Sequence, residues 1–223
     1  MKDRILVWDL PTRIFHWTLA ASFAGAFLTA ESERWRDVHV MLGFTALGLV
    51  AFRLCWGLIG TRYARFSEFV RGPAEVTRYL GSLLSRQPRH YVGHNPAGAL
   101  AIVALLALAV LVCASGWLLY ADVGGEVFEE LHEGISFAML AVVGVHVAGV
   151  VMSSVLHREN LVRAMIDGHK EGPREAGIAG SRALIGVTLA AAIAGFWVWS
   201  MAAGDATTGA QKTEHASVQR YDD

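Results

Sequence analysis

Five long stretches of apolar residues alternate with polar segments along the 223-residue chain. A helix needs about 20 predominantly apolar residues to cross the hydrocarbon core of a membrane. The five stretches approach or reach this length, and they are residues 14–30, 38–60, 98–120, 135–156 and 183–203. The third and the fifth carry no charged residue. The pattern predicts an all-α protein with five membrane-spanning helices, the fourth of which we expect to begin at His132.

The first stretch has some features of a cleaved secretory signal, because basic residues precede it and Ala30 closes it. However, Leu28 fits the small-residue pattern of a cleavage site poorly. A histidine and two tryptophans near the start of the stretch are also unusual for a signal. We therefore expect a helix that stays in the mature protein.

The charged residues are distributed unevenly between the loops. The connection over residues 61–96 carries six arginines, and the connection over residues 156–182 carries five basic residues. The other two loops are short and contain several acidic residues. Because cytoplasmic loops are enriched in Lys and Arg, we expect a multi-pass protein of the bacterial inner membrane, with its N-terminus in the cytoplasm and its C-terminus in the periplasm.

Two smaller features accompany this topology. The connection over residues 61–96 is long, and Pro73 at an early helical position predicts a short surface helix around Pro73–Leu84. Residues 205–223 are polar and low in bulky side chains, which predicts a flexible periplasmic tail.

The composition fits a membrane protein, with 54% hydrophobic and only 17% charged residues. A net charge of −1 gives no basis for a nucleic-acid partner. The two cysteines, Cys55 and Cys113, lie inside apolar stretches, which favours small buried residues over a metal site. The motif C-x-x-C-H does not occur in the sequence, so covalent attachment of a c-type haem is excluded.

Four of the nine histidines lie in or at the edge of the apolar stretches: His16, His39, His132 and His146. Each alone could be a polar group bonded between helices, but ionisable residues inside a membrane are candidate functional residues. His16 lies 14 residues before Ala30, and His146 lies 14 residues after His132. At 1.5 Å per residue, both lie about 21 Å below the periplasmic side. His39 and His132 lie at that side, so the depths predict two pairs, His16–His146 and His39–His132.

The rotation along the helices agrees with these pairs. Fourteen residues turn a helix by about 1400°, close to four full turns, so His132 and His146 should face the same way. Arg53 follows His39 at the same spacing, and it could bind a haem propionate near the lower pair or extend to the cytoplasmic interface. Gly43, four residues after His39, could leave room for a flat macrocycle or serve a contact between helices.

Paired histidines on facing helices are typical ligands of b-type haem in helical bundles. Iron with two imidazole ligands has no free coordination position, which favours electron transfer over oxygen chemistry. Zinc is a weaker interpretation, because two separate pairs lack the third and fourth ligands of a zinc site. The histidines therefore predict a protein that holds two haems at two depths.

Several motifs together resemble the bacterial cytochrome b561 and nickel–iron hydrogenase cytochrome b family. They are WDLPTRIFHW from Trp8, HVMLG from His39, RLCWGLIGTRYARF from Arg53, GHNPAG from Gly93, LHE from Leu131, VHV from Val145 and HRENLVRAM from His157. Each motif is short, but the set covers roughly residues 4–170.

The resemblance implies a transmembrane four-helix bundle over residues 1–170, with helices at about 14–30, 38–60, 98–120 and 132–156. It implies two b haems with His16, His39, His132 and His146 as axial ligands. A fifth transmembrane helix within residues 171–204 lies outside the well-matched part. His94 and His157 belong to the motifs and could contact a propionate or a quinone, or lie at the surface.

Members of the family pass electrons between the membrane quinone pool and a redox partner. The arginine–phenylalanine loop and the HREN motif are most similar to the branch associated with periplasmic c-type cytochromes. Two alternatives stay open. The chain could anchor a hydrogenase or dehydrogenase in the membrane, as a subunit of a quinone-linked oxidoreductase. It could also be a haem-free transporter or assembly factor, although no inverted repeat or broken helix is visible.

Overall fold

The computed structural model describes residues 3–84 and 89–219 and, within them, the side chains of all but 83–84 and 204–219. The helices are α1 (Leu10–Thr29), α2 (Arg36–Ile59), α3 (Phe66–Phe69), α4 (Pro73–Leu84), α5 (Pro96–Tyr120), α6 (Gly125–His157), α7 (Leu161–Asp167) and α8 (Ala183–Gln219). Two strands, β1 (Asp3–Leu6) and β2 (His169–Gly172), and three single 3-10 turns complete the described elements: η1 (Glu33–Trp35), η2 (Arg62–Ala64) and η3 (Arg174–Ala176).

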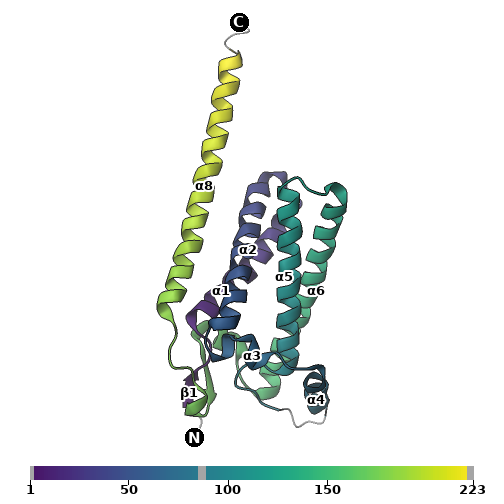
Figure 1. Ribbon diagram of the computed structural model, residues 1–223, viewed down its shortest axis with the longest axis vertical. Coiled ribbons are helices and arrows are strands. Elements are labelled where there is room, and N and C mark those ends of the chain that lie inside the picture. Colours follow the sequence, from purple (N-terminus) through teal and green to yellow (C-terminus); the bar gives the residue numbers. More distant parts are fainter. Residues whose placement is uncertain (1–2, 85–88, 220–223) are drawn as a thin grey trace.

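Helices α1, α2, α5 and α6 stand side by side as a bundle (Figure 1). Four helical segments of the described chain are long and apolar enough to cross a membrane: Glu33–Ile59, Pro96–Tyr120, Gly125–His157 and Ala183–Ala203. Helix α1, the first predicted span, is not among them, since Arg13 and His16 make its first half more polar. Its 20 residues pack along α2, and its passage through the membrane stays a prediction.

Helices α1, α2, α5 and α6 begin earlier than the apolar pattern predicts. Asp9 caps α1 by accepting a hydrogen bond from the Thr12 amide at 2.8 Å, so α1 starts at Leu10. Helix α6 begins at Gly125, directly after Gly124 in a left-handed conformation (φ 93°) that turns the chain. The expected start at His132 is therefore wrong by two turns, because the acidic first turns of α6 hide the helix from an apolar pattern. The predicted surface helix Pro73–Leu84 is confirmed as α4.

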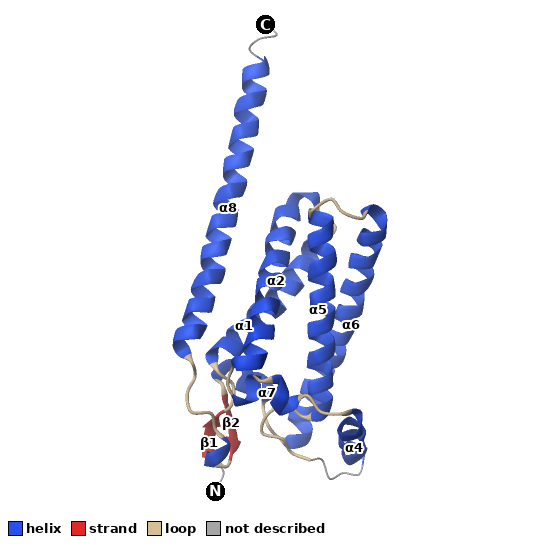
Figure 2. Cartoon of the chain, in the orientation of Figure 1, coloured by secondary structure: helices blue, strands red, loops and turns tan. Residues whose placement is uncertain are grey.

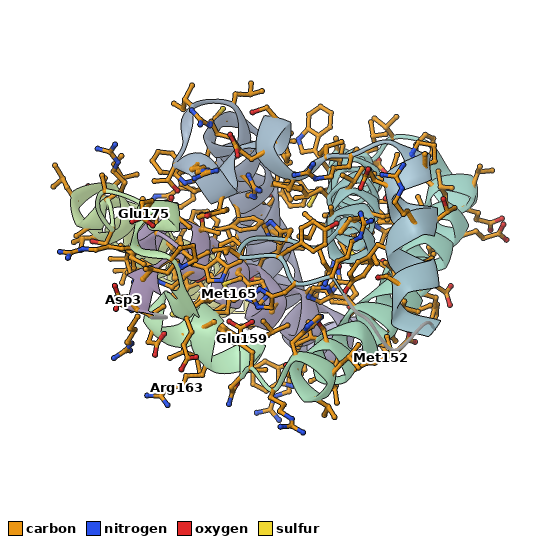
Figure 3. All side chains as sticks on the ribbon, turned by 90° about the horizontal axis from the view of Figure 1, so that it is seen from below. Asp3, Met152, Glu159, Arg163, Met165 and Glu175 are labelled. Atoms are coloured by element: carbon orange, nitrogen blue, oxygen red, sulfur yellow. The ribbon has the colours of Figure 1, made fainter. Side chains whose placement is uncertain are left out.

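The lower end of the molecule in Figure 1 holds the connections with most of the basic residues, and it contains the one departure from an all-helical fold among the described residues. Strands β1 and β2 pair antiparallel there (Figure 2). Side chains from α1 also reach the last turn of α7: Arg13 donates to the Ile166 carbonyl at 2.6 Å, and Trp17 donates to the Met165 carbonyl at 3.1 Å. Seen from below, charged side chains such as Glu159 and Arg163 lie on this end (Figure 3).

Helix α8 leans against the side of the bundle formed by α1 and α2. Gly186 allows the close approach, because a Cβ atom there would lie 2.7 Å from Leu10 Cγ. Further along, the Trp197 indole donates to the Thr45 hydroxyl at 2.9 Å. The helix continues to Gln219 through most of the predicted tail, whose flexibility stays a prediction. Strand β1 and the last turns of α8 lie at opposite ends of the molecule (Figure 1).

Candidate functional site

The upper histidine pair, His39 on α2 and His132 on α6, lies close to the turns at the top of the bundle in Figure 1. The two ring centroids are 6.2 Å apart, with an angle of 73° between the planes. The structure therefore brings these two predicted ligands together face to edge. Because a metal–imidazole bond is about 2 Å long, an iron atom bonded to both rings requires a separation of this order.

Backbone carbonyls orient both rings of the upper pair. His39 Nδ1 lies 2.8 Å from the Ala26 carbonyl oxygen, and His132 Nδ1 lies 3.1 Å from that of Val112. Since a carbonyl can only accept, each Nδ1 carries the proton and donates it. Nε2 of each ring is then the unprotonated nitrogen, which is the form that binds a metal.

Helix α5 supplies two further contacts to His132 that sequence reasoning missed. The Ser115 hydroxyl lies 3.0 Å from His132 Nδ1. A Cβ atom on Gly116 would lie 3.0 Å from His132 Cε1, so the ring packs directly against the backbone there. The sequence could have indicated these contacts, because Ser115 and Gly116 are two small residues, one of them polar, inside an apolar stretch without charge. Gly43, by contrast, has open space around its Cβ position, as a neighbouring macrocycle would require.

The lower pair, His16 on α1 and His146 on α6, lies deeper in the bundle. The two rings are near enough to interact electrostatically. His16 Nδ1 is buried and has no hydrogen-bond partner among the described residues. This pair is therefore placed by its helices, without the carbonyl contacts that orient the upper pair.

Arg53 on α2 is buried beside the lower pair, with only 3% of its surface exposed. Its guanidinium carbon lies 4.8 Å from the ring centroid of Phe66, 5.9 Å from that of Phe69 and 6.0 Å from that of Phe15. Aromatic faces attract a cation, but its Nη1 has no hydrogen-bond partner among the described residues. The Asp9 carboxylate is near enough to interact with this charge, but a buried N–H donor without a hydrogen-bond partner is costly, and a haem carboxylate is the type of group that would satisfy it.

His94 lies next to the same site, in the segment before α5. Its ring lies between Trp8 and Phe69, with both ring centroids 4.6 Å away. Burial and, to a smaller extent, the positive charges of Arg53 and Lys170 lower the pKa of His94 to about 3. His94 Nδ1 has no partner among the described residues. The alternative of a surface histidine is therefore wrong: His94 is a neutral ring in an aromatic cage beside the lower pair.

Asp9 holds the two helices that carry His16 and Arg53 in register. It is fully buried and accepts hydrogen bonds from the Trp56 indole at 3.1 Å and the Thr61 hydroxyl at 2.5 Å. These contacts join the start of α1 to the end of α2. In the sequence, Asp9 stands out as a charged residue between apolar neighbours. Its two hydrogen-bond partners, however, lie about 50 positions further along the chain.

A cluster of charged side chains lies below the lower pair. Lys170 Nζ, on a side chain that is 3% exposed, lies 3.1 Å from Glu159 Oε2. His90 Nε2 lies 3.3 Å from the same oxygen, and the His90 and His157 rings are 5.5 Å apart. Burial lowers the pKa of Lys170, and its pairing with Glu159 opposes this shift. Figure 3 shows Glu159 toward the middle of this end.

The comparisons with known proteins identify the family of the chain. The sequence model of the family described as prokaryotic cytochrome b561 matches residues 7–168. The chain belongs to this family. No solved structure gives a significant match.

Several curated relatives of this cytochrome are named probable Ni/Fe-hydrogenase B-type cytochrome subunit. The relative from Rhodobacter capsulatus is 24% identical, over 76% of this chain and 82% of that protein. The relative from Azotobacter vinelandii is 28% identical, over 75% of this chain and 88% of that protein. The relative from Rhizobium leguminosarum bv. viciae is 25% identical, over 76% of this chain and 90% of that protein.

Family membership and the apolar helices establish the general character of the molecule. It is a multi-pass membrane cytochrome that uses haem b in electron transport. The buried Nη1 of Arg53, the free Nε2 nitrogens of the upper pair and the open space at Gly43 all fit a bound haem.

Proposed function

We propose that this cytochrome binds two b haems and carries electrons between the two sides of the membrane. One haem would lie between His39 and His132, and the other between His16 and His146. The observation that carries the proposal is the presence of two histidine pairs at two levels of one bundle, with α6 contributing to both. Haem iron with two imidazole ligands exchanges single electrons without a change of ligands.

The protein would assist each haem with different groups. At the upper site, the carbonyls of Ala26 and Val112 keep the imidazoles in the tautomer that binds iron. At the lower site, the Arg53 guanidinium would bind a propionate through charge-assisted hydrogen bonds. Gly43 would leave space for the macrocycle against α2.

The proposed topology has five spans, α1, α2, α5, α6 and α8, in the bacterial inner membrane. Helix α1 would cross as a partner of α2, although it is the most polar of the five. The basic connections at the lower end support a cytoplasmic N-terminus and a periplasmic C-terminus. Residues 1–170 would form the haem-binding bundle, residues 171–204 an added span and residues 205–223 a periplasmic tail.

We further propose that the cytochrome exchanges electrons with membrane quinone and with an oxidoreductase. The names of the relatives favour an enzyme subunit, such as a hydrogenase, as the redox partner. A periplasmic c-type cytochrome is the second candidate, on the resemblance of the arginine–phenylalanine loop and the HREN motif. The names give no support to a haem-free transporter or assembly factor.

Two measurements test the proposal. Haem extraction from purified protein should give two b haems per chain, and a value of one or zero would contradict the two-site arrangement. Gentle purification from the native membrane should recover either a subunit with iron–sulfur clusters or a c-type cytochrome. Reduction of the haems by added quinol should then be measured with and without that partner, and an unchanged spectrum would exclude quinone as a donor.

A further inference from the structure

A cavity of about 240 Å³ opens at the lower end of the bundle, outside both histidine pairs. It lies between the chain that follows α2, the segment before α5 and η3. Its wall includes Arg62, Arg71, Phe69 and Tyr91, with His94 at the side toward the haem ligands. A single water occupies about 30 Å³ of liquid, so the cavity has room for a polar group of several non-hydrogen atoms.

The rim of this cavity carries more positive than negative charge. Glu68 is the one carboxylate among the lining residues, and it is shared by Arg62 at 3.4 Å and Arg65 at 3.6 Å. Among the described residues, Arg71 donates to the Glu68 backbone carbonyl alone, at 3.4 Å. Two guanidinium groups therefore share one carboxylate, and the third, that of Arg71, has no carboxylate partner among the described residues. Each guanidinium has five N–H donors, so several are left for a ligand. This excess favours an anion.

The inner wall is aromatic and has little unused polar surface. Phe69 is 3% exposed, and the Tyr63 hydroxyl already donates to the Ala176 carbonyl at 2.7 Å. Burial raises the pKa of Tyr63, so its ring stays neutral. A ligand would thus meet cations at the rim and apolar ring faces inside, which suits an anionic group joined to an apolar body.

Exposed apolar side chains lie directly beside the basic rim. Leu58 and Ile59, at the end of α2, are 73% and 78% exposed, and Val70 next to Arg71 is 51% exposed. In a membrane protein these positions lie where the hydrocarbon core gives way to the headgroups. Basic pockets at this level bind the headgroups of anionic lipids.

We propose that this cavity is a binding site for the phosphate headgroup of an anionic phospholipid. Arg62 and Arg71 bind the phosphate, the headgroup enters between Tyr63 and Phe69, and the acyl chains lie along Leu58, Ile59 and Val70. The general enrichment of arginine in cytoplasmic loops explains on which side these residues lie. It does not explain why they surround one aromatic cavity. The proposal is independent of the haem count and of the redox partner.

The test is native mass spectrometry of the full haem-loaded chain, titrated with phosphatidylglycerol and with phosphatidylcholine of the same acyl chains. Wild type should retain phosphatidylglycerol selectively. Arg62→Gln combined with Arg71→Gln should weaken retention roughly thirty-fold, from about one kcal/mol per arginine near the surface. The matched control combines Arg78→Gln with Arg163→Gln, which removes the same charge from the same end without touching the cavity, and it should bind within about twofold of wild type.

Three results would overturn the assignment. If the cavity variant and the control lose phosphatidylglycerol retention equally, the effect comes from net charge and not from this cavity. Equal retention of the two lipids by wild type would contradict selection of an anion. Binding of inorganic phosphate as tight as that of the lipid would identify the free anion as the ligand. If the double variant does not fold, as judged by its haem spectrum, Arg71→Gln alone serves, because the exposed Arg71 side chain has no carboxylate partner in the described structure.

Discussion

The upper and lower histidine pairs share helix α6 but have different surroundings. Backbone carbonyls of Ala26 and Val112 bond Nδ1 of the two upper rings, so these rings are oriented before any cofactor binds. At the lower pair, His16 Nδ1 and Arg53 Nη1 are buried without a hydrogen-bond partner among the described residues. The comparison indicates that the main chain already orients the rings of the upper pair, whereas the buried Arg53 Nη1 near the lower pair would gain a partner from a bound group such as a haem carboxylate.

This difference has a consequence for stability. An unsatisfied buried donor costs about 1–3 kcal/mol, and more if it is charged. Haem loss should therefore destabilise the lower half of the bundle more than the upper half. Side-chain substitutions should also disturb the lower site more readily, because carbonyl groups of the main chain cannot be removed by mutation.

The largest expected effect comes from removing one ligand of each pair. His146→Ala should reduce the haem content from two per chain to about one, and His132→Ala should do the same at the other site, because a single imidazole holds haem weakly. The two variants should lose different spectral components. Pyridine haemochrome analysis with low-temperature spectra checks this, and a loss of the same component in both would contradict the assigned pairs.

A smaller effect is expected at the helix contact of the upper pair. Gly116→Val would place side-chain atoms where the His132 ring lies, since a Cβ atom there is already 3.0 Å from Cε1. Overpacking of this kind costs about 1–3 kcal/mol, so the upper haem should be partly lost while the lower one is retained. Gly134→Val on α6, where the Cβ position is open, is the matched control. Equal haem loss in both would refute a specific contact.

Removal of the positive charge of Arg53 should change the midpoint potential of the lower haem and leave that of the upper haem unchanged. A nearby positive charge stabilises the reduced iron relative to the oxidised iron, so Arg53→Met should lower the midpoint potential by about 60 mV, which is a tenfold change in a one-electron equilibrium. Spectroscopic redox titration resolves the two haems. Arg34→Met, at an exposed position near the opposite end, should shift neither, and an unchanged lower potential in Arg53→Met would exclude a propionate contact.

The smallest effect is predicted for Ser115→Ala. The hydroxyl lies 3.0 Å from His132 Nδ1, but the Val112 carbonyl accepts from the same nitrogen. The variant should keep both haems, and the upper potential should move by less than about 30 mV, half the shift that corresponds to a tenfold change. A loss of the upper haem in this variant would mean that the carbonyl does not orient the ring by itself.

The sequence predicted those parts of the molecule that follow from regular spacing. The placement of His39 and His132 at one level comes from counting residues along helices, and the surface helix α4 comes from the length of its connection and from Pro73 at an early helical position. The Asp9 contacts to Trp56 and Thr61 could not be predicted this way, because they join residues about 50 positions apart without any periodic signal. The same holds for the aromatic cage of His94 and for the β1–β2 pair. The start of α6 was missed because its first turns are acidic.

The polarity of α1 also bears on how the chain enters the membrane. Helix α1 carries Arg13 and His16, and it falls short of the apolar character of the other long helices. Residues 30–35 make a short turn to α2, which is apolar enough to insert by itself. We therefore expect the two helices to leave the translocation machinery together as a hairpin, with the Asp9 contacts closing its open end. Synthesis of α2 would then be the step that commits the N-terminal part of the protein to the lipid phase.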